Sequence, residues 1–336
     1  MGGRMPGVIG HLKNPSVSEV AELADAAESA GARWLGLADA FWWRDVWVLL
    51  TVAAGATHRL WLGPAMTNPY LRHPFTTISA LATLQELAGA RVFLGLAAGG
   101  SEARLAAKVD RRDAPARTAA LIELVRRVAT GQPLDVESGR HLDVPLAPLP
   151  VVVAGGHDGM LRTAGRHADR ALMWATAGSE LERVSDVIRD GASARTDGGP
   201  EVVWAPLTAL PDDPEADVAD VAVYAVLNAR PGVVDRWGLG GDVLEKIRSA
   251  IVAGDRDGAR RRVPDAVLGD LVLGGPEADP QAVAARARAA GVTSIAVPVF
   301  SVAGVEARVA WGVAVEDALG RSPVPGAAVT GDAEDV

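Results

Sequence analysis

Two glycine-rich stretches stand directly after short apolar runs of this 336-residue chain and directly before segments of helical pattern. They read Ala-Gly-Gly-Ser-Glu from position 98 and Gly-Gly-His-Asp-Gly from position 155. A glycine-rich turn ahead of a helix directs backbone N–H groups toward a phosphate, and such a site needs no lysine. The sequence therefore predicts one shared anion site formed by Ala98, Gly99, Gly100, Ser101, Gly155, Gly156 and His157.

Three titratable side chains are candidates for moving a proton: Asp39, His73 and Glu102. Asp39 follows the second apolar run, His73 lies in the polar stretch TNPYLRHP, and Glu102 follows the first glycine-rich turn. Each also has a structural interpretation. Asp39 or His73 would cap a helix, and a carboxylate such as Glu102 is favourable in a first helical turn because of the macrodipole.

One pattern recurs along the chain: an alanine-rich helix, a glycine, and then a short apolar or β-branched strand. In the first copy Ser16 and Glu19 are spaced as a capping box, and Gly31 suits the end of the helix. Short all-apolar strands that alternate with helices are typical of parallel sheets buried on both faces. Eight strands are expected, at 6–11, 33–38, 60–66, 91–97, 150–155, 171–175, 201–207 and 293–300.

Eight such units favour an α/β fold, a (β/α)8 TIM barrel, over an open doubly wound sheet. No GxGxxG follows the first strand, which further weakens the dinucleotide-binding alternative. Residues 1–320 are expected to form this single domain, with a helical insertion at 211–262 between the seventh and eighth strands. The tail 321–336 lacks bulky apolar residues, so we expect it to be disordered.

Function in such a barrel gathers at the carboxyl ends of the strands. His11 ends the first strand there and is a candidate for contacting substrate. Trp42 and Trp43 are candidates for roofing the same pocket, although packing beneath a loop explains them equally well. The six histidines form no pair spaced as metal ligands, so no metal site is expected.

The composition excludes several classes of function. The formal net charge is −9, whereas a nucleic-acid-binding protein carries a basic excess. No apolar run is long enough to cross a membrane, and the N-terminus does not read as a secretory signal. The chain has no cysteine and hence no thiolate chemistry. A cytoplasmic protein is the default expectation.

Three segments together resemble the luciferase-like monooxygenase superfamily. They are TNPYLRHP, ALATLQELAGARVFLGLAAGGS and VVVAGGHDGMLRTAGRHADRAL. The sequence of these segments is most similar to the deazaflavin branch that includes methylenetetrahydromethanopterin reductase. The likeness covers most of the chain from Val17 to about Ala175 and returns at 279–299.

The resemblance implies a TIM-like barrel, usually dimeric, that binds coenzyme F-420 (an 8-hydroxy-5-deazaflavin) or FMN in its mouth. It implies a cofactor phosphate on Ala98–Ser101 and Gly155–His157. Asp39 is a candidate for a hydrogen bond to the cofactor as well as for an acid. The end of the third strand, Ala65, Met66, Thr67 and Asn68, would back the planar ring. A non-proline cis peptide of the family's deazaflavin enzymes maps to Ala65–Met66.

Two departures from the family pattern concern chemistry. Several deazaflavin enzymes carry an acid followed by histidine after the second strand, where Asp39 is here followed by Ala40. After the fifth strand, Gly156-His157-Asp158-Gly159 replaces a Gly-Pro-Lys-like sequence and removes a cation near the phosphate.

These observations favour an oxidoreductase that transfers a hydride between coenzyme F-420 and a small organic substrate. An FMNH2-dependent monooxygenase shares the fold and the phosphate site and stays open as an alternative. Ala40 also leaves open a cofactor-binding protein without turnover. The determinants of the substrate are expected in the loop 42–47 and in residues 211–242 of the insertion.

Overall fold

The computed structural model describes residues 6–40, 42–100, 112–210 and 215–320. Its main sheet has eight parallel strands in the order β3-β2-β1-β10-β7-β6-β5-β4. They are β1 (Gly7–Gly10), β2 (Trp34–Leu37), β3 (Trp61–Pro64), β4 (Leu94–Leu96), β5 (Val151–Ala154), β6 (Arg170–Trp174), β7 (Glu201–Ala205) and β10 (Ser294–Val299). Each lies within one of the eight segments expected from the sequence or within one residue of it.

The sheet closes into a barrel between β3 and β4. Parallel bridges join Leu62 to Val92 and Thr67 to Leu96. The chain takes five steps between the two bridges on the β3 side and four on the β4 side, so one extra residue bulges from the end of β3. This bulge explains why regular pairing stops at Pro64 and begins only at Leu94, although the sequence predicted strands at 60–66 and 91–97.

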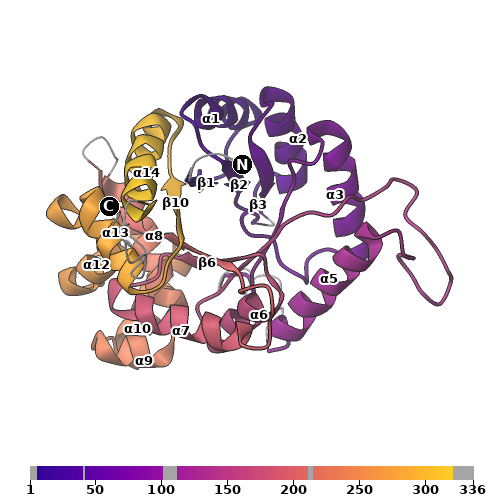
Figure 1. Ribbon diagram of the computed structural model, residues 1–336. Helices are drawn as coiled ribbons and strands as arrows, with labels where there is room; N and C mark the ends of the chain where they lie inside the picture. The colour runs from indigo at the N-terminus through magenta and orange to yellow at the C-terminus, as the bar shows by residue number, and fades with distance from the viewer. Residues whose placement is uncertain (1–5, 41, 101–111, 211–214, 321–336) are drawn as a thin grey trace, which may run out of the picture.

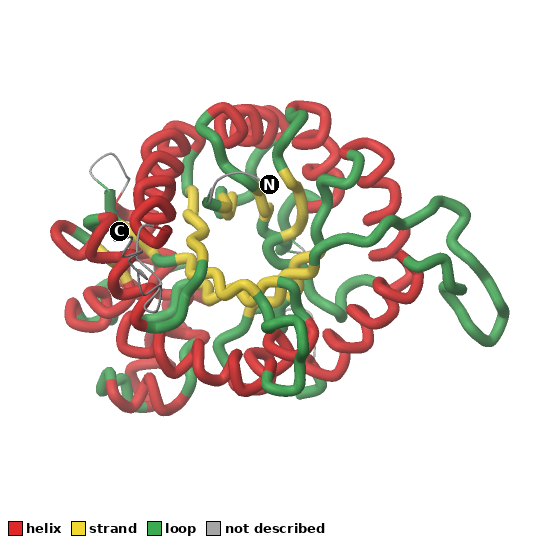
Figure 2. Tube along the Cα trace, viewed as in Figure 1, coloured by secondary structure: helices red, strands yellow, loops and turns green. Residues whose placement is uncertain are grey.

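Helices surround the strands as the outer layer of a (β/α)8 TIM barrel (Figures 1 and 2), which confirms the predicted fold class. The barrel helices are α1 (Val17–Ser29), α2 (Val46–Ala56), α3 (Pro74–Ala88), α5 (Ala114–Ala129), α6 (Asp158–His167), α7 (Leu181–Ala192), α13 (Pro280–Ala289) and α14 (Val305–Gly320). The predicted capping box is present: Ser16 Oγ accepts from the Glu19 amide, and the Glu19 carboxylate accepts from the Ser16 amide.

Apart from Arg170, Glu201 and Ser294 at the starts of β6, β7 and β10, the strands are apolar because both of their faces are buried. Side chains such as Ile9, Phe93 and Leu172 fill the inside of the barrel, whereas Val8, Leu94 and Met173 alternate with them and pack against the helices. This alternation accounts for apolar runs without a polar face.

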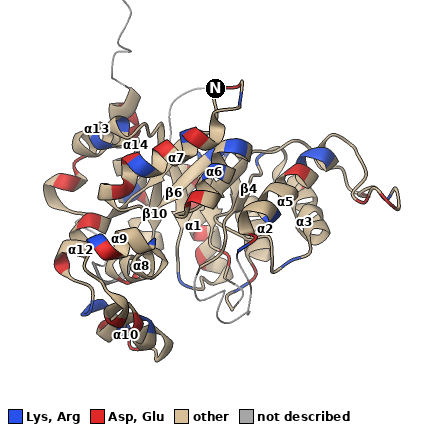
Figure 3. Ribbon diagram, turned by 90° about the horizontal axis from the view of Figure 1, so that it is seen from below, with Lys and Arg blue, Asp and Glu red and all other residues tan. Residues whose placement is uncertain are grey.

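Five α-helices and two short strands lie between β7 and α13 in the described part of the chain. They are β8 (Leu207–Thr208), α8 (Glu215–Asn228), α9 (Pro231–Arg236), α10 (Gly241–Val252), α11 (Arg256–Arg260), α12 (Asp265–Leu271) and β9 (Val272–Leu273). They have an apolar core of their own that includes Val226, Ile247 and Val267. Acidic and basic side chains intersperse on α10, which lies apart from the barrel helices (Figure 3).

A long loop between α5 and β5, residues 130–150, projects from the side of the barrel (Figure 1). The side-chain amide of Gln85 on α3 holds its returning limb by bonding both the N–H and the carbonyl of Ala147. The sequence analysis did not single out this projection. Within the described ranges, no helix combines the length and apolarity needed to cross a membrane.

Candidate active site

The carboxyl ends of the eight strands open at one end of the barrel, and most of the predicted site residues follow them there. His11 follows β1 and donates its amide hydrogen to the carbonyl of Val299 on β10. Asp39 follows β2, and Thr67 and Asn68 follow β3. Ser101 and Glu102, predicted after β4, lie outside the described residues, so their assigned roles stay predictions.

The end of β3 is pressed between its two neighbouring strands. The peptide bond between Ala65 and Met66 is cis, as the resemblance predicted. A Cβ added to Gly95 on β4 would overlap the carbonyl oxygen of Pro64 and lie 2.7 Å from Met66 Sδ. A Cβ added to Gly36 on β2 would overlap Ala65. Glycines on both sides therefore make room for the bulge.

Asp39 and Thr67 are joined across the ends of β2 and β3, since Thr67 Oγ1 donates a hydrogen bond of 2.6 Å to Asp39 Oδ2. Burial raises the pKa of Asp39 above its ordinary value, and the Thr67 hydrogen bond opposes this shift. Asp45, not Asp39, caps α2, so the alternative interpretation of Asp39 as a helix cap is wrong. The position suits a proton carrier whose charged form is costly.

Asn68 has a local structural role in this structure. Its Oδ1 accepts from the amides of Tyr70 and Leu71, both at 3.1 Å, and so fixes the turn after the bulge. His73 is the N-cap of α3: its Nδ1 accepts from the Phe75 amide, and Pro74 begins the helix. The helix-capping interpretation of His73 is therefore confirmed, and its catalytic role stays a prediction.

The two glycine-rich turns leave the barrel side by side. Leu96 at the end of β4 pairs with Val153 on β5, so Ala98–Gly100 and Gly155–His157 follow from neighbouring strand ends. Gly99 has a φ of 73°, in the region that glycine adopts without strain. A Cβ added to Gly100 or Gly156 would meet nothing within 4 Å. There is consequently open space beside both turns.

The helix after the second turn also suits an anion. α6 begins at Asp158, and the side chain of His157 does not cap its first-turn amides. The first amides of a helix have no partner within the helix itself, and the positive end of the macrodipole lies at the same place. Gly155 itself packs against Met160 of this helix, because a Cβ there would lie 2.5 Å from Met160 Cβ. The turn is therefore held tightly on one side and open on the other.

Four aromatic rings line another part of the mouth. Ring centroids of Trp174, Phe300 and Trp43 lie 5.3, 6.0 and 6.4 Å from that of His11. Burial lowers the pKa of His11 to about 4, so its imidazole is neutral at physiological pH. Trp42 is 46% exposed. The sequence analysis missed Trp174 and Phe300, although both stand at the ends of predicted strands.

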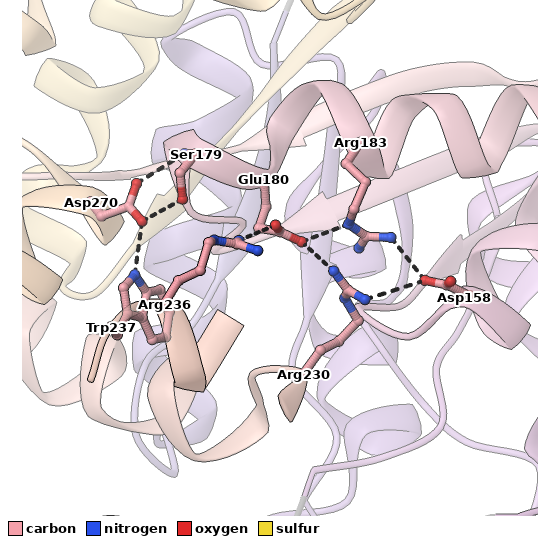
Figure 4. A network of polar contacts seen from close by, with 8 residues as sticks. All are labelled: Asp158, Ser179, Glu180, Arg183, Arg230, Arg236, Trp237 and Asp270. Carbon is pink, nitrogen blue, oxygen red and sulfur yellow. Dashed lines mark hydrogen bonds and ion pairs between the residues drawn. The ribbon is translucent and has the colours of Figure 1, made fainter. Parts of the chain in front are cut away.

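A network of charged side chains ties the insertion to the barrel beside α6 (Figure 4). Glu180, which follows β6 and is 5% exposed, accepts hydrogen bonds from Arg183, Arg230 and Arg236. Burial opposes the charge on Glu180, but the three arginines prevail and lower its pKa to about 2. Arg183 also donates to Asp158 at the start of α6.

Asp270 of α12 makes a second connection close by. It accepts from the amide and hydroxyl of Ser179 and from Nε1 of Trp237 (Figure 4). The insertion is thus fixed beside the mouth. No cluster of three or more metal-ligating side chains occurs among the residues that the structure describes.

The luciferase-like monooxygenase family model matches residues 4–295. The chain belongs to this family. It is 26% identical over 268 residues to the 5,10-methylenetetrahydromethanopterin reductase of Archaeoglobus fulgidus, which covers 75% of this chain and 81% of that protein. It is 30% identical over 203 residues to the F420-dependent glucose-6-phosphate dehydrogenase of Kineococcus radiotolerans, which covers 54% of this chain and 60% of that protein.

The fold has a close counterpart among solved structures. The coenzyme F420-dependent tetrahydromethanopterin reductase of Methanopyrus kandleri superimposes with a TM-score of 0.75 at 22% identity, over 91% of this chain and 97% of that chain. The architecture predicted from the resemblance is therefore also that of a solved structure.

Proposed function

We propose that this protein is an oxidoreductase that transfers a hydride between coenzyme F-420 and a small organic substrate. The observation that carries the proposal is the bulged end of β3 beside two open glycine turns at one barrel mouth. The relative from Kineococcus radiotolerans, whose name states F420 dependence, supports the choice of cofactor.

The residues present fit such a cofactor. The amides of Ala98–Ser101 and Gly155–His157 would hold its phosphate, since the space beside Gly100 and Gly156 is open. The backbone of Ala65–Asn68 would support the planar ring, because Gly36 and Gly95 let the bulge lie flat against β2 and β4. When bound, coenzyme F-420 would supply the centre that accepts or donates the hydride.

The protein would supply orientation and proton transfer. Asp39 would exchange a proton with substrate, because burial favours its protonated form and Thr67 fixes its orientation. Trp43, Trp174 and Phe300 would exclude water from the reacting atoms. Glu102 and His73 stay predicted alternatives for the proton donor.

Cofactor titration tests this function. Purified protein is mixed with coenzyme F-420 or with FMN, and quenching of the cofactor fluorescence is followed. The proposal expects saturable binding of coenzyme F-420 and turnover with an added substrate. Preferential binding of FMN would instead support the second candidate, a monooxygenase, in keeping with the name of the matching family. Binding without turnover would support a carrier protein.

We also propose that the protein is a homodimer that uses the outer faces of α2 and α3. α2 contains no charged residue, yet Val48 on its outer face is 59% exposed. Leu87 on the neighbouring α3 is 58% exposed. An outward helix face without charge and with exposed aliphatic side chains is typical of a subunit interface.

A further inference from the structure

Three arginines from two separate parts of the chain meet beside α6. Arg183 lies on α7, whereas Arg230 precedes α9 of the insertion and Arg236 ends it. All three donate hydrogen bonds to the carboxylate of Glu180, which lies between them (Figure 4). These three residues, the arginine cluster, therefore bring positive charge to the side of the barrel mouth in a protein whose formal net charge is −9.

The arginine cluster adjoins the second glycine-rich turn. Asp158 directly follows His157 and begins α6. Nη1 of Arg183 donates to Oδ1 of Asp158 at 2.9 Å, and Nη1 of Arg230 lies 4.0 Å from the same oxygen. The turn has no lysine or arginine of its own. A ligand whose phosphate lies on Gly155–His157 therefore has these guanidinium groups as its neighbours.

The carboxylates within the cluster do not exhaust its hydrogen-bond donors. A guanidinium group has five N–H donors. Nη2 of Arg183 and Nε of Arg230 are enclosed and have no hydrogen-bond partner among the residues that the structure describes. Buried donors without acceptors are uncommon in proteins, and cations that are short of acceptors favour a further anion nearby. The arginine cluster is therefore short of negative charge.

Arg236 is the member of the cluster that faces outward. Its side chain is 50% exposed, compared with 30% for Arg183 and 23% for Arg230. Within the described ranges it donates to Glu180 and to no other group. Asp270, the remaining carboxylate in Figure 4, accepts from a serine and a tryptophan instead. An anion can therefore reach the guanidinium of Arg236 from solvent.

The order of these features around the barrel matches the order of groups along the proposed cofactor. The bulge that would support the ring follows β3, the two glycine-rich turns follow β4 and β5, and Glu180 follows β6. These four strands are successive neighbours in the closed sheet. Coenzyme F-420 carries its phosphate on a side chain of the ring, and beyond the phosphate that side chain continues as γ-linked glutamates. Each glutamate adds one carboxylate.

We propose that the arginine cluster binds the acidic chain that continues beyond the cofactor phosphate, with Arg236 as the principal contact. This inference rests on the proposed function and adds a second anion site to it. A guanidinium group binds a carboxylate through two parallel N–H bonds, so an outward arginine suits a chain that bears carboxylates. Glu180 does not touch the chain in this arrangement. It is a positioning residue that holds the three arginines in place.

Cofactor forms that differ only in the chain provide the first test. Full-length protein is titrated with coenzyme F-420 that bears a long glutamate chain and with its precursor, which has the phosphate but no glutamate. At low salt the chain should lower Kd about tenfold, as two or three exposed ion pairs would. At about 1 M salt, where the Debye length is about 3 Å, most of this difference should vanish.

The outcomes of this titration separate the inference from the proposed function. Equal Kd values for the two forms at low salt would leave the proposed function intact and overturn the inference. Failure of both forms to bind would refute the proposed function and the inference with it.

Arg236→Gln provides the second test. The ratio of the two Kd values should fall from about ten to about one, because glutamine removes the charge. Arg236→Lys should keep part of the ratio, since lysine keeps the charge but not the paired donors. Arg189→Gln is the matched control and should leave the ratio unchanged, because Arg189 of α7 is 59% exposed and pairs with Asp186.

Two results with Arg236→Gln would overturn the inference. One is a ratio of Kd values that stays near that of the wild type. The other is an equal rise in both Kd values, which would mean that the substitution disturbs the phosphate site and not a contact with the chain.

An NMR measurement tests the contact directly. In spectra of protein with ¹⁵N-labelled arginine, the side-chain Nε resonance that is absent from Arg236→Gln should shift when the long-chain cofactor is added. The precursor should move it much less, and the Arg189 resonance should respond to neither form. An Arg236 resonance that does not move at saturating long-chain cofactor contradicts the proposed contact.

Discussion

Thr67 at the end of β3 donates a hydrogen bond of 2.6 Å to the carboxylate of Asp39 at the end of β2. This bond connects the residue proposed to move a proton with the bulge proposed to support the cofactor ring. Asp39 takes its position from that bulge, because the Thr67 amide donates to the carbonyl of Gly95 on β4 and the Thr67 carbonyl accepts from the amide of Ala97 just after β4. The geometry of the acid thus depends on three successive strands.

Asp39→Asn should separate cofactor binding from catalysis. Asparagine keeps the shape and can still accept from Thr67, but it cannot exchange a proton. We expect coenzyme F-420 to bind as before and kcat to fall about 10²- to 10⁴-fold. Steady-state kinetics and cofactor titration of the same preparation measure both quantities. A kcat equal to that of the wild type would show that a group other than Asp39 exchanges the proton.

The same variant should change stability with a defined sign. The folded-state pKa of Asp39 lies above its ordinary value of 3.8, so its protonated form contributes stability that is present below pH 3.8 and is lost as pH rises through the folded pKa. The difference in free energy of unfolding between Asp39→Asn and the wild type should therefore favour the variant more at pH 7 than at pH 3. Thermal unfolding at the two pH values measures the difference, and a gain confined to pH 3 would contradict this sign.

Glu180→Gln should loosen the insertion. The substitution leaves three arginines without their shared carboxylate, and removing one partner of a buried ion pair costs about 3 kcal/mol. Because the pKa of Glu180 is lowered to about 2 from 4.5, the wild type has this stability above pH 4.5 and loses it as pH falls toward 2. Urea unfolding between pH 3 and pH 7 should show that dependence in the wild type and not in Glu180→Gln.

Glu182→Gln is the matched control for this measurement. Glu182 lies two residues further along the chain, in the first turn of α7, and its side chain is exposed. Its loss should change the free energy of unfolding by less than about 0.5 kcal/mol. Equal effects of the two substitutions would mean that the network does not stabilise the insertion.

Gly156→Val tests the phosphate site. The new side chain would enter open space, so the fold should keep its stability within about 0.5 kcal/mol. The same space is proposed for the phosphate, and loss of one charge-assisted hydrogen bond, about 1.5–3 kcal/mol, raises Kd about tenfold or more. Gly269→Val on α12, also in open space, is the control for fluorescence titration with coenzyme F-420. Unchanged affinity in Gly156→Val would place the phosphate elsewhere.

Local signals were sufficient to predict the elements of the barrel and several of its site positions. Ser16 with Glu19 gave the start of α1, and the short apolar runs gave all eight strands because each strand is buried on both faces. The aromatic side chains around His11 could not be predicted in the same way. Trp174 and Phe300 reach His11 only because the barrel closes. No local sequence pattern indicates which strand ends become neighbours.

The charged network was missed for a related reason. Arg230 and Arg236 lie in an insertion whose sequence carries no recognisable motif, and their shared partner Glu180 lies 50 residues or more away in sequence. A buried carboxylate with three guanidinium partners is a property of tertiary packing. A further short helix, α12 at Asp265–Leu271, follows the segment 211–262 that was predicted as the insertion.

Val48→Lys should dissociate the proposed dimer. Val48 is 59% exposed on the uncharged outer face of α2, and a lysine there would have to be buried without a partner when two copies meet. The monomer should fold normally, because the side chain of Val48 points away from its own core. Light scattering after gel filtration should give a mass near 34.7 kDa for Val48→Lys and twice that mass for the wild type. Val252→Lys on α10, where valine is 76% exposed, is the control and should stay dimeric. A dimer that persists in Val48→Lys would show that the subunit interface does not include α2.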